Sequence, residues 1–397
     1  MKSTVYLTGI EEPEPRALFD SQTTGTKLRG AGKWSITHQR LVSGPSQGVE
    51  VVSLNNGRMS VAVVPTRGMG ISRAQLGEIP LEWKSPVRRL VHPSLIDLGS
   101  RNGLGWLDGF NELLCRCGLS FNGPPGDDKG AKGGTESHVT LHGRTANTPA
   151  YRVHAEVEDA GQGTLSVTGM VDELTFFGPQ LRLQSTVSTI AGSTAFTIRD
   201  EVENLASSPA ELELLYHFNV GRPFLEQGSS VACPAKAVVP RDPRAAEGID
   251  TFAAYLGPTP GYAEQVYFYE PLGDDKGESL AMLKNAHGHL GVSIAFNVRE
   301  LPRFSLWKCT QADSDGYVTG LEPGTNYPNF KQYERDQKRV VLIPPGGKYT
   351  ASVTITIHDT PQSVAEAEAR IKKLQGSAAP QVHKTPQKGW SAAGDEA

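Results

Sequence analysis

The sequence predicts an all-β protein, a large antiparallel β-sandwich with a short C-terminal helix. Two observations lead to this prediction. First, β-branched and alternating runs recur along the chain, and Gly, Pro, Asn and Asp separate them. Second, only one stretch has a convincing helical pattern. Because many antiparallel strands with almost no helix bury their apolar faces by packing sheet on sheet, we expect a single large sandwich.

The predicted strands follow one another from residue 49 to residue 357. Residues 350–357 alternate between polar and apolar types almost strictly, as a half-buried antiparallel strand does. Asn55, Asn56 and Gly57 separate two runs and are typical of a hairpin turn. The expected strands are 49–53, 60–64, 151–157, 164–171, 181–190, 195–203, 210–218, 265–269, 290–296, 303–308 and 349–357, and long loops are expected at 86–134 and 239–260.

The one predicted helix covers residues 361–374. Ser363 is its expected N-cap, and Lys372 and Lys373 lie in its last turn, where they complement the helix dipole. No repeat or linker divides the β-rich region, so residues 31–375 are expected to form one sandwich domain. We expect residues 1–30 to lead into the sandwich or pack on it. Residues 376–397 lack periodicity and are expected to be a disordered tail.

Composition and charge exclude several classes of function. The 397 residues carry a formal charge of −4, so there is no basic excess that favours nucleic acid. The N-terminus lacks the apolar core of a signal peptide, and no run is long enough to span a membrane, so a cytoplasmic protein is expected. The sequence does not determine the oligomeric state. Without zinc, calcium or nucleotide motifs, we expect no metal and no cofactor, and free thiols at Cys115, Cys117, Cys233 and Cys309.

Three distant segments each place one polar side chain in strand-like sequence. His217 lies within a hydrophobic strand, where an imidazole can titrate near neutrality. Glu322 comes directly before a proline, which restricts it to extended geometry, and a partly apolar pocket would give it the pKa of a general base. His142 precedes a glycine that lets a ligand approach the backbone. If the fold brings them together, two histidines and a carboxylate form an acid/base set for sugar chemistry.

Other residues are candidates for substrate binding. Arg144 offers a planar fork of donors for hydroxyl or carboxylate groups. Arg67 lies between an apolar strand and glycines, and Trp106 is a candidate for stacking on a sugar face. Each candidate also has a structural interpretation: a core histidine, a solvated turn glutamate, a surface arginine or a core tryptophan.

Together these segments resemble the galactose-mutarotase-like superfamily, and more closely the aldose-1-epimerase-like family known as DUF4432. The chain order His, His, Glu is also that of the superfamily. The resemblance implies a supersandwich of antiparallel strands with a sugar cleft on its concave face. The matching stretches are 64–71 (VPTRGMGI), 81–86 (LEWKSP), 105–123 (GWLDGFNELLCRCGLSFNG), 141–150 (LHGRTANTPA), 215–225 (LYHFNVGRPFL) and 321–326 (LEPGTN).

The resemblance also implies roles. His217, in YHFN, matches the general acid, and Glu322, before its proline, matches the general base. His142, in LHG, matches the histidine that binds the sugar and helps at the ring oxygen. The continuations HGR and YHFN depart from the usual mutarotase patterns. The implied substrate-binding residues are Arg67, Arg144, Asn219 and Trp106, with Asp242 as the candidate for the aspartate that holds sugar hydroxyls.

We therefore expect an isomerase that interconverts the anomers of a small carbohydrate, an aldose or a uronate, by general acid/base catalysis. One base and one acid suffice for this reaction, without a metal or a nucleotide. Two alternatives stay open. The first is another isomerase, a lyase or a hydrolase on an acidic sugar, which Arg67 and Arg144 would favour. The second is a non-catalytic carbohydrate-binding protein, because a fold does not fix a function.

Overall fold

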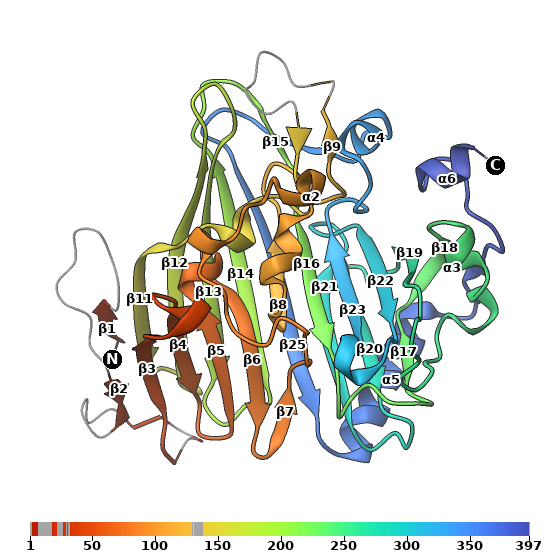
Figure 1. The fold of residues 1–397 in the computed structure, drawn as a ribbon. Coiled ribbons are helices and arrows are strands. Elements are labelled where there is room, and N and C mark those ends of the chain that lie inside the picture. Colours follow the sequence, from red (N-terminus) through yellow and green to blue (C-terminus); the bar gives the residue numbers. More distant parts are fainter. Residues whose placement is uncertain are drawn as a thin grey trace.

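The computed structural model describes residues 2–6, 18–21, 27, 28, 30, 32–128, 130 and 138–396. Two large sheets lie face to face (Figure 1). The first sheet has nine strands, and every neighbouring pair in it is antiparallel. Its order is β1 (Lys2–Tyr6), β11 (Tyr151–Glu158), β12 (Thr164–Leu174), β13 (Gln180–Ile190), β14 (Ala195–Asn204), β25 (Lys348–His358), β21 (Gly291–Asn297), β20 (Glu278–Lys284) and β17 (Ser230–Ala232).

The second sheet has thirteen strands and carries the candidate site. Its pairs are antiparallel except the last, in which β26 runs parallel to β18. The order is β2 (Leu18–Asp20), β3 (Ser35–Arg40), β4 (Glu50–Asn55), β5 (Met59–Val64), β6 (Gly70–Leu76), β8 (Leu114–Cys117), β16 (Leu215–Val220), β23 (Val318–Gly324), β22 (Arg303–Cys309), β19 (Gln265–Pro271), β18 (Ala235–Pro240) and β26 (Gln381–Val382), with β7 (Ile79–Leu81) paired to β6.

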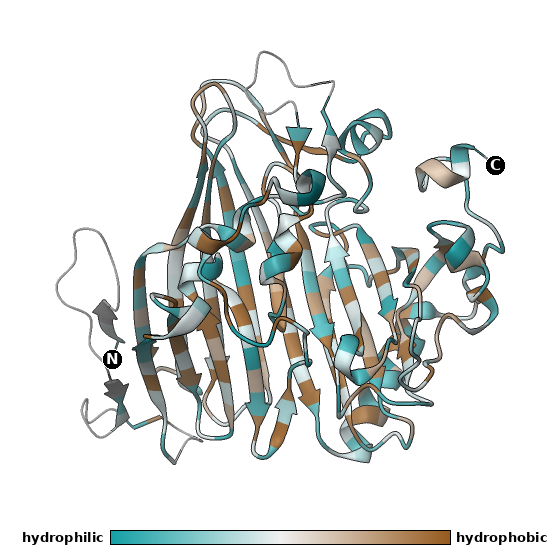
Figure 2. Ribbon diagram, viewed as in Figure 1, coloured by the Kyte–Doolittle hydropathy of each residue, from teal (hydrophilic) through white to brown (hydrophobic). Residues whose placement is uncertain are grey.

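Period-two alternation of side chains builds the core between the sheets. Apolar and polar bands alternate along many strands in Figure 2. In β25, Val353, Ile355 and Ile357 are buried while the residues between them are partly exposed. Each such buried side chain contributes roughly 1.5–3 kcal/mol of hydrophobic stabilisation. The predicted fold class, a large antiparallel β-sandwich, is thus confirmed.

The predicted helix is α5 (Pro361–Gln375), but its N-cap differs from the prediction. Thr360 is the N-cap, and Ser363 is the third helical residue of a reciprocal capping box. The Thr360 hydroxyl accepts a hydrogen bond from the backbone N–H of Ser363, and the Ser363 hydroxyl accepts one from that of Thr360. The helix packs its apolar face on β20 through Val364, Ala367 and Ile371.

Short elements connect the strands. The expected loop 86–134 contains β8, which pairs with β16 in the middle of the second sheet. The small pairs are β9 (Gly126–Asp127) with β10 (His138–Val139), and β15 (Ala210–Leu212) with β24 (Val341–Ile343). The short helices are η1 (Gly44–Ser46), η2 (Pro65–Arg67), η3 (Pro93–Leu95), α2 (Ser100–Gly103), η4 (Gly105–Gly109), η5 (Thr145–Asn147), α3 (Pro243–Ala246), η6 (Ile249–Thr251), η7 (Asp313–Asp315), α4 (Lys331–Asp336) and α6 (Ala392–Asp395).

The C-terminal residues 376–396 do not match the expected disordered tail. β26 adds to the edge of the second sheet beside β18, and His383 continues the pairing by donating its N–H to Val238. Further on, the ring of Trp390 stacks on that of Tyr327, with 5.4 Å between the centroids. α6 ends the segment near α3 and β18 (Figure 1). Individual side-chain contacts, rather than a periodic pattern, hold this segment.

Two further expectations concern the chain as a whole. All four cysteines carry free thiols. Among the residues that the structure describes, no helix combines the length and the apolar character that crossing a membrane requires.

Candidate active site

The strand register brings His217 and Glu322 together on one face of the second sheet. β16 and β23 are neighbours, with Leu215 paired to Gly324 and Phe218 to Leu321. His217 and Glu322 therefore occupy facing positions, at which side chains point to the same side of a sheet. Nε2 of His217 lies 3.3 Å from Oε1 of Glu322, and both side chains are almost fully buried.

His142 reaches the same place from a loop. Its backbone is left-handed, with φ of 57°, and Gly143 follows at φ of 71°. A Cβ at Gly143 would meet the carbonyl oxygen of Gly118 at 2.4 Å, so only glycine fits this turn. The ring of His142 lies 5.6 Å from the ring of His217 and 4.7 Å from that of Trp106. His142, His217 and Glu322 thus share one cavity, although they are far apart in the sequence.

The cavity above these three residues has a volume of about 550 Å³. This lies within the range of small-molecule sites, which are mostly apolar and carry a few convergent polar groups. The apolar lining is Leu104, Trp106, Leu107, Phe110, Pro124, Pro125, Leu141, Val266, Trp307, Pro328, Phe330, Ala392 and Ala393, and the other polar lining residues are Arg241, Asp242, Glu264, Asn329 and Ser391.

Hydrogen bonds fix the tautomers of both histidines. The Asn219 amide donates from Nδ2 to the carbonyl oxygen of Glu112 at 3.0 Å, so its Oδ1 is the acceptor that faces His217. Nδ1 of His217 therefore carries a proton and donates it to Asn219 at 2.7 Å. Nδ1 of His142 likewise donates to the carbonyl oxygen of Asn122 at 2.7 Å. In each neutral ring, Nε2 is left as the acceptor.

Burial shifts all three ionisable groups toward their neutral forms. It raises the pKa of Glu322 well above its ordinary value, and the charge of Glu264 adds to this, while Arg241 acts in the opposite direction. Burial lowers the pKa of His217 to about 3, and His142 contributes in the same direction. Burial also lowers the pKa of His142 to about 4. Burial therefore favours a protonated Glu322 beside a neutral His217, a pair that holds one transferable proton.

An ion-paired wall stands on the β18 side of the cavity. Arg241 donates to Asp242 at 2.8 Å and to Glu264 at 3.1 Å. Nε1 of Trp307 donates to the other oxygen of Glu264 at 2.6 Å, which fixes the indole 5.3 Å from the ring of His217. Cavity walls of this kind, an oriented indole beside carboxylates and a guanidinium, suit a ligand with an apolar face and several hydroxyl groups.

The family follows from comparison with known proteins. The model of a family described as "Domain of unknown function (DUF4432)" matches residues 46–357, well over half of the chain. The chain belongs to the DUF4432 family. A comparison of this DUF4432 chain with curated proteins gave no match.

Solved structures place the DUF4432 chain among mutarotase-like folds. A protein of Klebsiella pneumoniae subsp. pneumoniae MGH 78578, described as a "putative aldose 1-epimerase", is 35% identical, with a TM-score of 0.92 over 97% of this chain and 99% of that one. A galactose mutarotase-like protein of Clostridium acetobutylicum is 15% identical, with a TM-score of 0.56 over 81% of this chain and 98% of that one. The second likeness concerns the fold alone.

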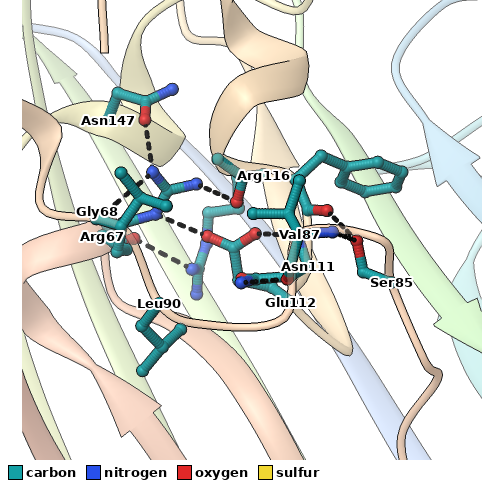
Figure 3. Close-up of polar contacts among 12 residues, drawn as sticks. Arg67, Gly68, Ser85, Val87, Leu90, Asn111, Glu112, Arg116 and Asn147 are labelled. Atoms are coloured by element: carbon teal, nitrogen blue, oxygen red, sulfur yellow. Dashed lines mark hydrogen bonds and ion pairs between the residues drawn. The ribbon is translucent and has the colours of Figure 1, made fainter. Parts of the chain in front are cut away.

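Arg67 of the DUF4432 chain does not line the cavity. Figure 3 shows its side chain among hydrogen-bond partners that include Glu112 and Asn147. Its guanidinium is 1% exposed and is fully engaged. It donates to Glu112 at 2.7 Å, to Asn147 at 2.6 Å and to the carbonyl oxygen of Gly109 at 3.0 Å. A buried arginine needs such partners, so the expected sugar contact gives way to a structural one: Arg67 connects η4 and its following residues to η5.

Of the remaining predicted binding residues, some line the cavity and others do not. Trp106 and Asp242 line the cavity, and Asp242 also caps α3 by accepting from the N–H of Ala245. Asn219 is fully buried and reaches the site only through His217, so we place it behind the imidazole rather than against a ligand. Arg144 is exposed and lies outside the lining of the cavity.

Several site residues escaped the sequence interpretation. Trp307 and Glu264 carry no motif, but Trp307 lies in a predicted strand, two residues from Ser305, which pairs with Glu322. That register could have placed Trp307 on the same face of the sheet as Glu322. Cys115 pairs with His217 across β8 and β16, within an apolar run that was assigned to a loop. The C-terminal lining residues gave no signal because nothing periodic marks them.

Proposed function

We propose that the protein is an aldose 1-epimerase-type isomerase that interconverts the α and β anomers of a small sugar. The observation that supports this best is the buried pair of His217 and Glu322, 3.3 Å apart on the floor of the cavity. Oε1 of Glu322 is buried, and its contact with Nε2 of His217 is the one polar contact that the structure gives this carboxyl group. Because Glu322 lines the cavity beside the imidazole and has no other polar contact, its carboxyl group is well suited to meet a substrate hydroxyl.

The reaction needs one base and one acid. Glu322, as carboxylate, takes the proton of the C1 hydroxyl while His217, as imidazolium, gives its Nε2 proton to the ring oxygen. The bond between C1 and the ring oxygen breaks, and C1 becomes a carbonyl. After rotation about the C1–C2 bond, the ring oxygen attacks the other face, and both protons return. Each positioned group contributes on the order of 10²–10⁴ in rate.

Ring opening reverses the protonation of the pair, although no proton passes directly between the two residues. His217 loses its proton to the ring oxygen and Glu322 gains that of the C1 hydroxyl, so in the open-chain complex His217 is neutral and Glu322 is protonated. The neutral pair that burial favours is therefore the state that matches the open-chain sugar. A sugar hydroxyl that donates to Glu322 stabilises its carboxylate and moves the proton back to His217. A bound sugar thus has to supply the hydrogen bonds that favour the charged pair over the neutral one.

The charges of the cavity favour an uncharged aldose over a uronate. Arg67 and Arg144, which would have suited an acidic sugar, lie outside the lining. Arg241 lines the cavity, but Asp242 and Glu264 already compensate its charge. Because the carboxylate of a uronate would be a third one beside these two and would meet repulsion, the acidic-sugar alternative has little support. Carboxylates that accept hydrogen bonds from hydroxyl groups serve a neutral sugar well.

Saturation-transfer NMR on a panel of aldoses and uronates tests the proposal. We expect the protein to accelerate exchange between the anomers of at least one neutral aldose, and to act more weakly on the uronates. Binding of a sugar without faster exchange would instead identify a carbohydrate-binding protein. Formation of a new product would identify a different isomerase or a lyase. Either result would overturn the proposed reaction.

A further inference from the structure

The C-terminal segment, residues 386–396, forms a side of the cavity that the proposed chemistry does not use. Ser391, Ala392 and Ala393 line the cavity beside Arg241 and Asp242. The segment lies beyond residues 46–357, the part of the chain that the family model matches. Because it lines the cavity without supplying a catalytic group, its small side chains act on the ligand through shape.

Trp390 anchors this segment to the sheet. Its ring stacks on Tyr327 at 5.4 Å and 25°, and Tyr327 stacks in turn on Phe268 at 4.5 Å and 20°. The carbonyl oxygen of Trp390 accepts a hydrogen bond of 2.9 Å from the side chain of Asn329, itself a lining residue. Stacking and hydrogen bonding together give this part of the chain a fixed position.

Ser391 attaches the segment to the wall of the cavity itself. Its side chain is buried, and its hydroxyl donates to the carbonyl oxygen of Arg241 at 2.5 Å. Nearby, Arg339 donates to the carbonyl oxygen of Gly389 at 2.7 Å. The residues that follow Ser391 are therefore held against the ion-paired wall.

The strand order shows which end of the cavity the segment closes. The catalytic pair lies on β16 and β23, and β22, β19 and β18 follow in order toward the edge. Arg241 directly follows β18, so the segment attached to it stands three strands from Glu322. At the usual spacing of neighbouring strands, this is roughly 14 Å along the sheet. The segment thus bounds the end of the cavity opposite the acid/base pair.

We propose that residues 391–393 set the length of the substrate. The cavity takes a single free sugar, with its anomeric carbon at His217 and Glu322, and a second sugar linked at the far side of the ring meets the C-terminal segment. The substrate class is then a free reducing monosaccharide rather than the reducing end of an oligosaccharide. This inference rests on the proposed function, and it adds Ala392 and Ala393 as residues that determine specificity.

Three full-length variants test the inference by anomer exchange. Each is measured with the aldose that the wild type exchanges fastest, and with a reducing disaccharide that carries this aldose at its reducing end. Ala393→Trp fills the cavity and should raise KM for the monosaccharide at least tenfold. Trp390→Ala loosens the segment and should raise the disaccharide-to-monosaccharide ratio of kcat/KM at least tenfold. Lys388→Trp, an equally bulky change at an exposed position of the segment, should alter neither.

The outcomes separate this inference from the proposed function. If the wild type accelerates no sugar, the proposed function fails and the inference fails with it. If the wild type exchanges the monosaccharide and the disaccharide equally well, only the length restriction is wrong. The same holds if Ala393→Trp and Trp390→Ala, with catalysis intact, leave KM and the ratio within twofold of the wild type.

Discussion

Arg67 and Glu322 are both ionisable residues buried in the region of the second sheet, and of the two only Arg67 has a complete set of partners. Figure 3 shows the partners of Arg67. All three nitrogens of its guanidinium donate hydrogen bonds, to Glu112, Asn147 and the backbone of Gly109. Glu322 instead has a single polar contact, with Nε2 of His217 at 3.3 Å, and lines a cavity.

This difference in partners shows two roles for a buried ionisable residue. Arg67 uses its charge to hold the fold together, whereas Glu322 is available to a ligand. Arg67 fastens the residues around η4, which carry Trp106 and Phe110, to η5, which follows His142. It therefore supports the aromatic side of the cavity without touching a substrate. Perturbed groups that lack partners mark functional sites more often than satisfied ion pairs do. Two buried charges in one region of the fold can thus serve opposite purposes.

Arg67→Met should have the largest effect, and on stability. The substitution leaves the carboxylate of Glu112 buried without its cation, which lowers the free energy of unfolding by about 3–5 kcal/mol. Urea denaturation measures this loss. Arg144→Met, at an exposed arginine, is the matched control and should stay within about 0.5 kcal/mol of the wild type. A loss below about 1 kcal/mol for Arg67→Met would mean that the cluster does not hold these loops.

His217→Asn should have the opposite effect: a large loss of activity and a small loss of stability. Asparagine keeps a polar group in place but cannot carry the proton that the ring oxygen requires, so kcat for anomer exchange should fall roughly 10²-fold or more. The free energy of unfolding should change by only about 1 kcal/mol, because His217 fastens no loop. Saturation-transfer NMR and urea denaturation give the two values. A variant that keeps near-normal kcat would remove His217 from the acid/base pair.

The pH dependence of the free energy of unfolding should show a smaller effect, which comes from His217 and Glu322. The pKa of His217 is about 3 in the fold and near 6.5 when unfolded, so in this range the unfolded chain binds a proton that the folded chain does not. Its contribution to stability is therefore present above pH 6.5 and is lost as the pH falls. Glu322 acts in the opposite sense, because its raised pKa makes stability fall as the pH rises above 4.5.

Urea denaturation at pH 4, 5, 6 and 7 would show this contrast. His217→Asn should flatten the loss of stability on acidification by at most ~1.4 kcal/mol per pH unit. Glu322→Gln should flatten the loss on the alkaline side. Arg144→Met should leave both slopes as in the wild type. Slopes that none of the variants changes would contradict the assigned pKa shifts.

Local patterns explain why much of the fold could be predicted. Strict alternation in residues 350–357 and the turn residues Asn56 and Gly57 carry their own structural information, and both lie where expected. β8 was missed because its short apolar run stands among glycines, where turn signals are stronger than strand signals. Its strand character depends on pairing with β16, a contact between distant segments that no local pattern reveals.

The candidate site shows the same limit. His142, His217 and Glu322 were recognised because each lies in a distinctive short motif. The place of Arg67 depends on Glu112, 45 residues further along, and the sequence around an arginine does not show its partner. The C-terminal segment is held by single contacts such as that of Trp390 with Tyr327. Contacts of this kind follow from the assembled fold rather than from periodicity.

Anomer exchange by Glu322→Gln tests most directly whether the carboxyl group of Glu322 is the catalytic base. Glutamine keeps the size of the side chain but cannot accept the C1 hydroxyl proton. We expect kcat to fall roughly 10²-fold or more with little change in KM, and no further fall when His217→Asn is added, because both groups serve one transition state. Glu366→Gln, at an exposed glutamate of α5, is the control and should match the wild type. If Glu322→Gln keeps wild-type exchange rates while the protein binds the sugar normally, the acid/base pair is not where the reaction takes place.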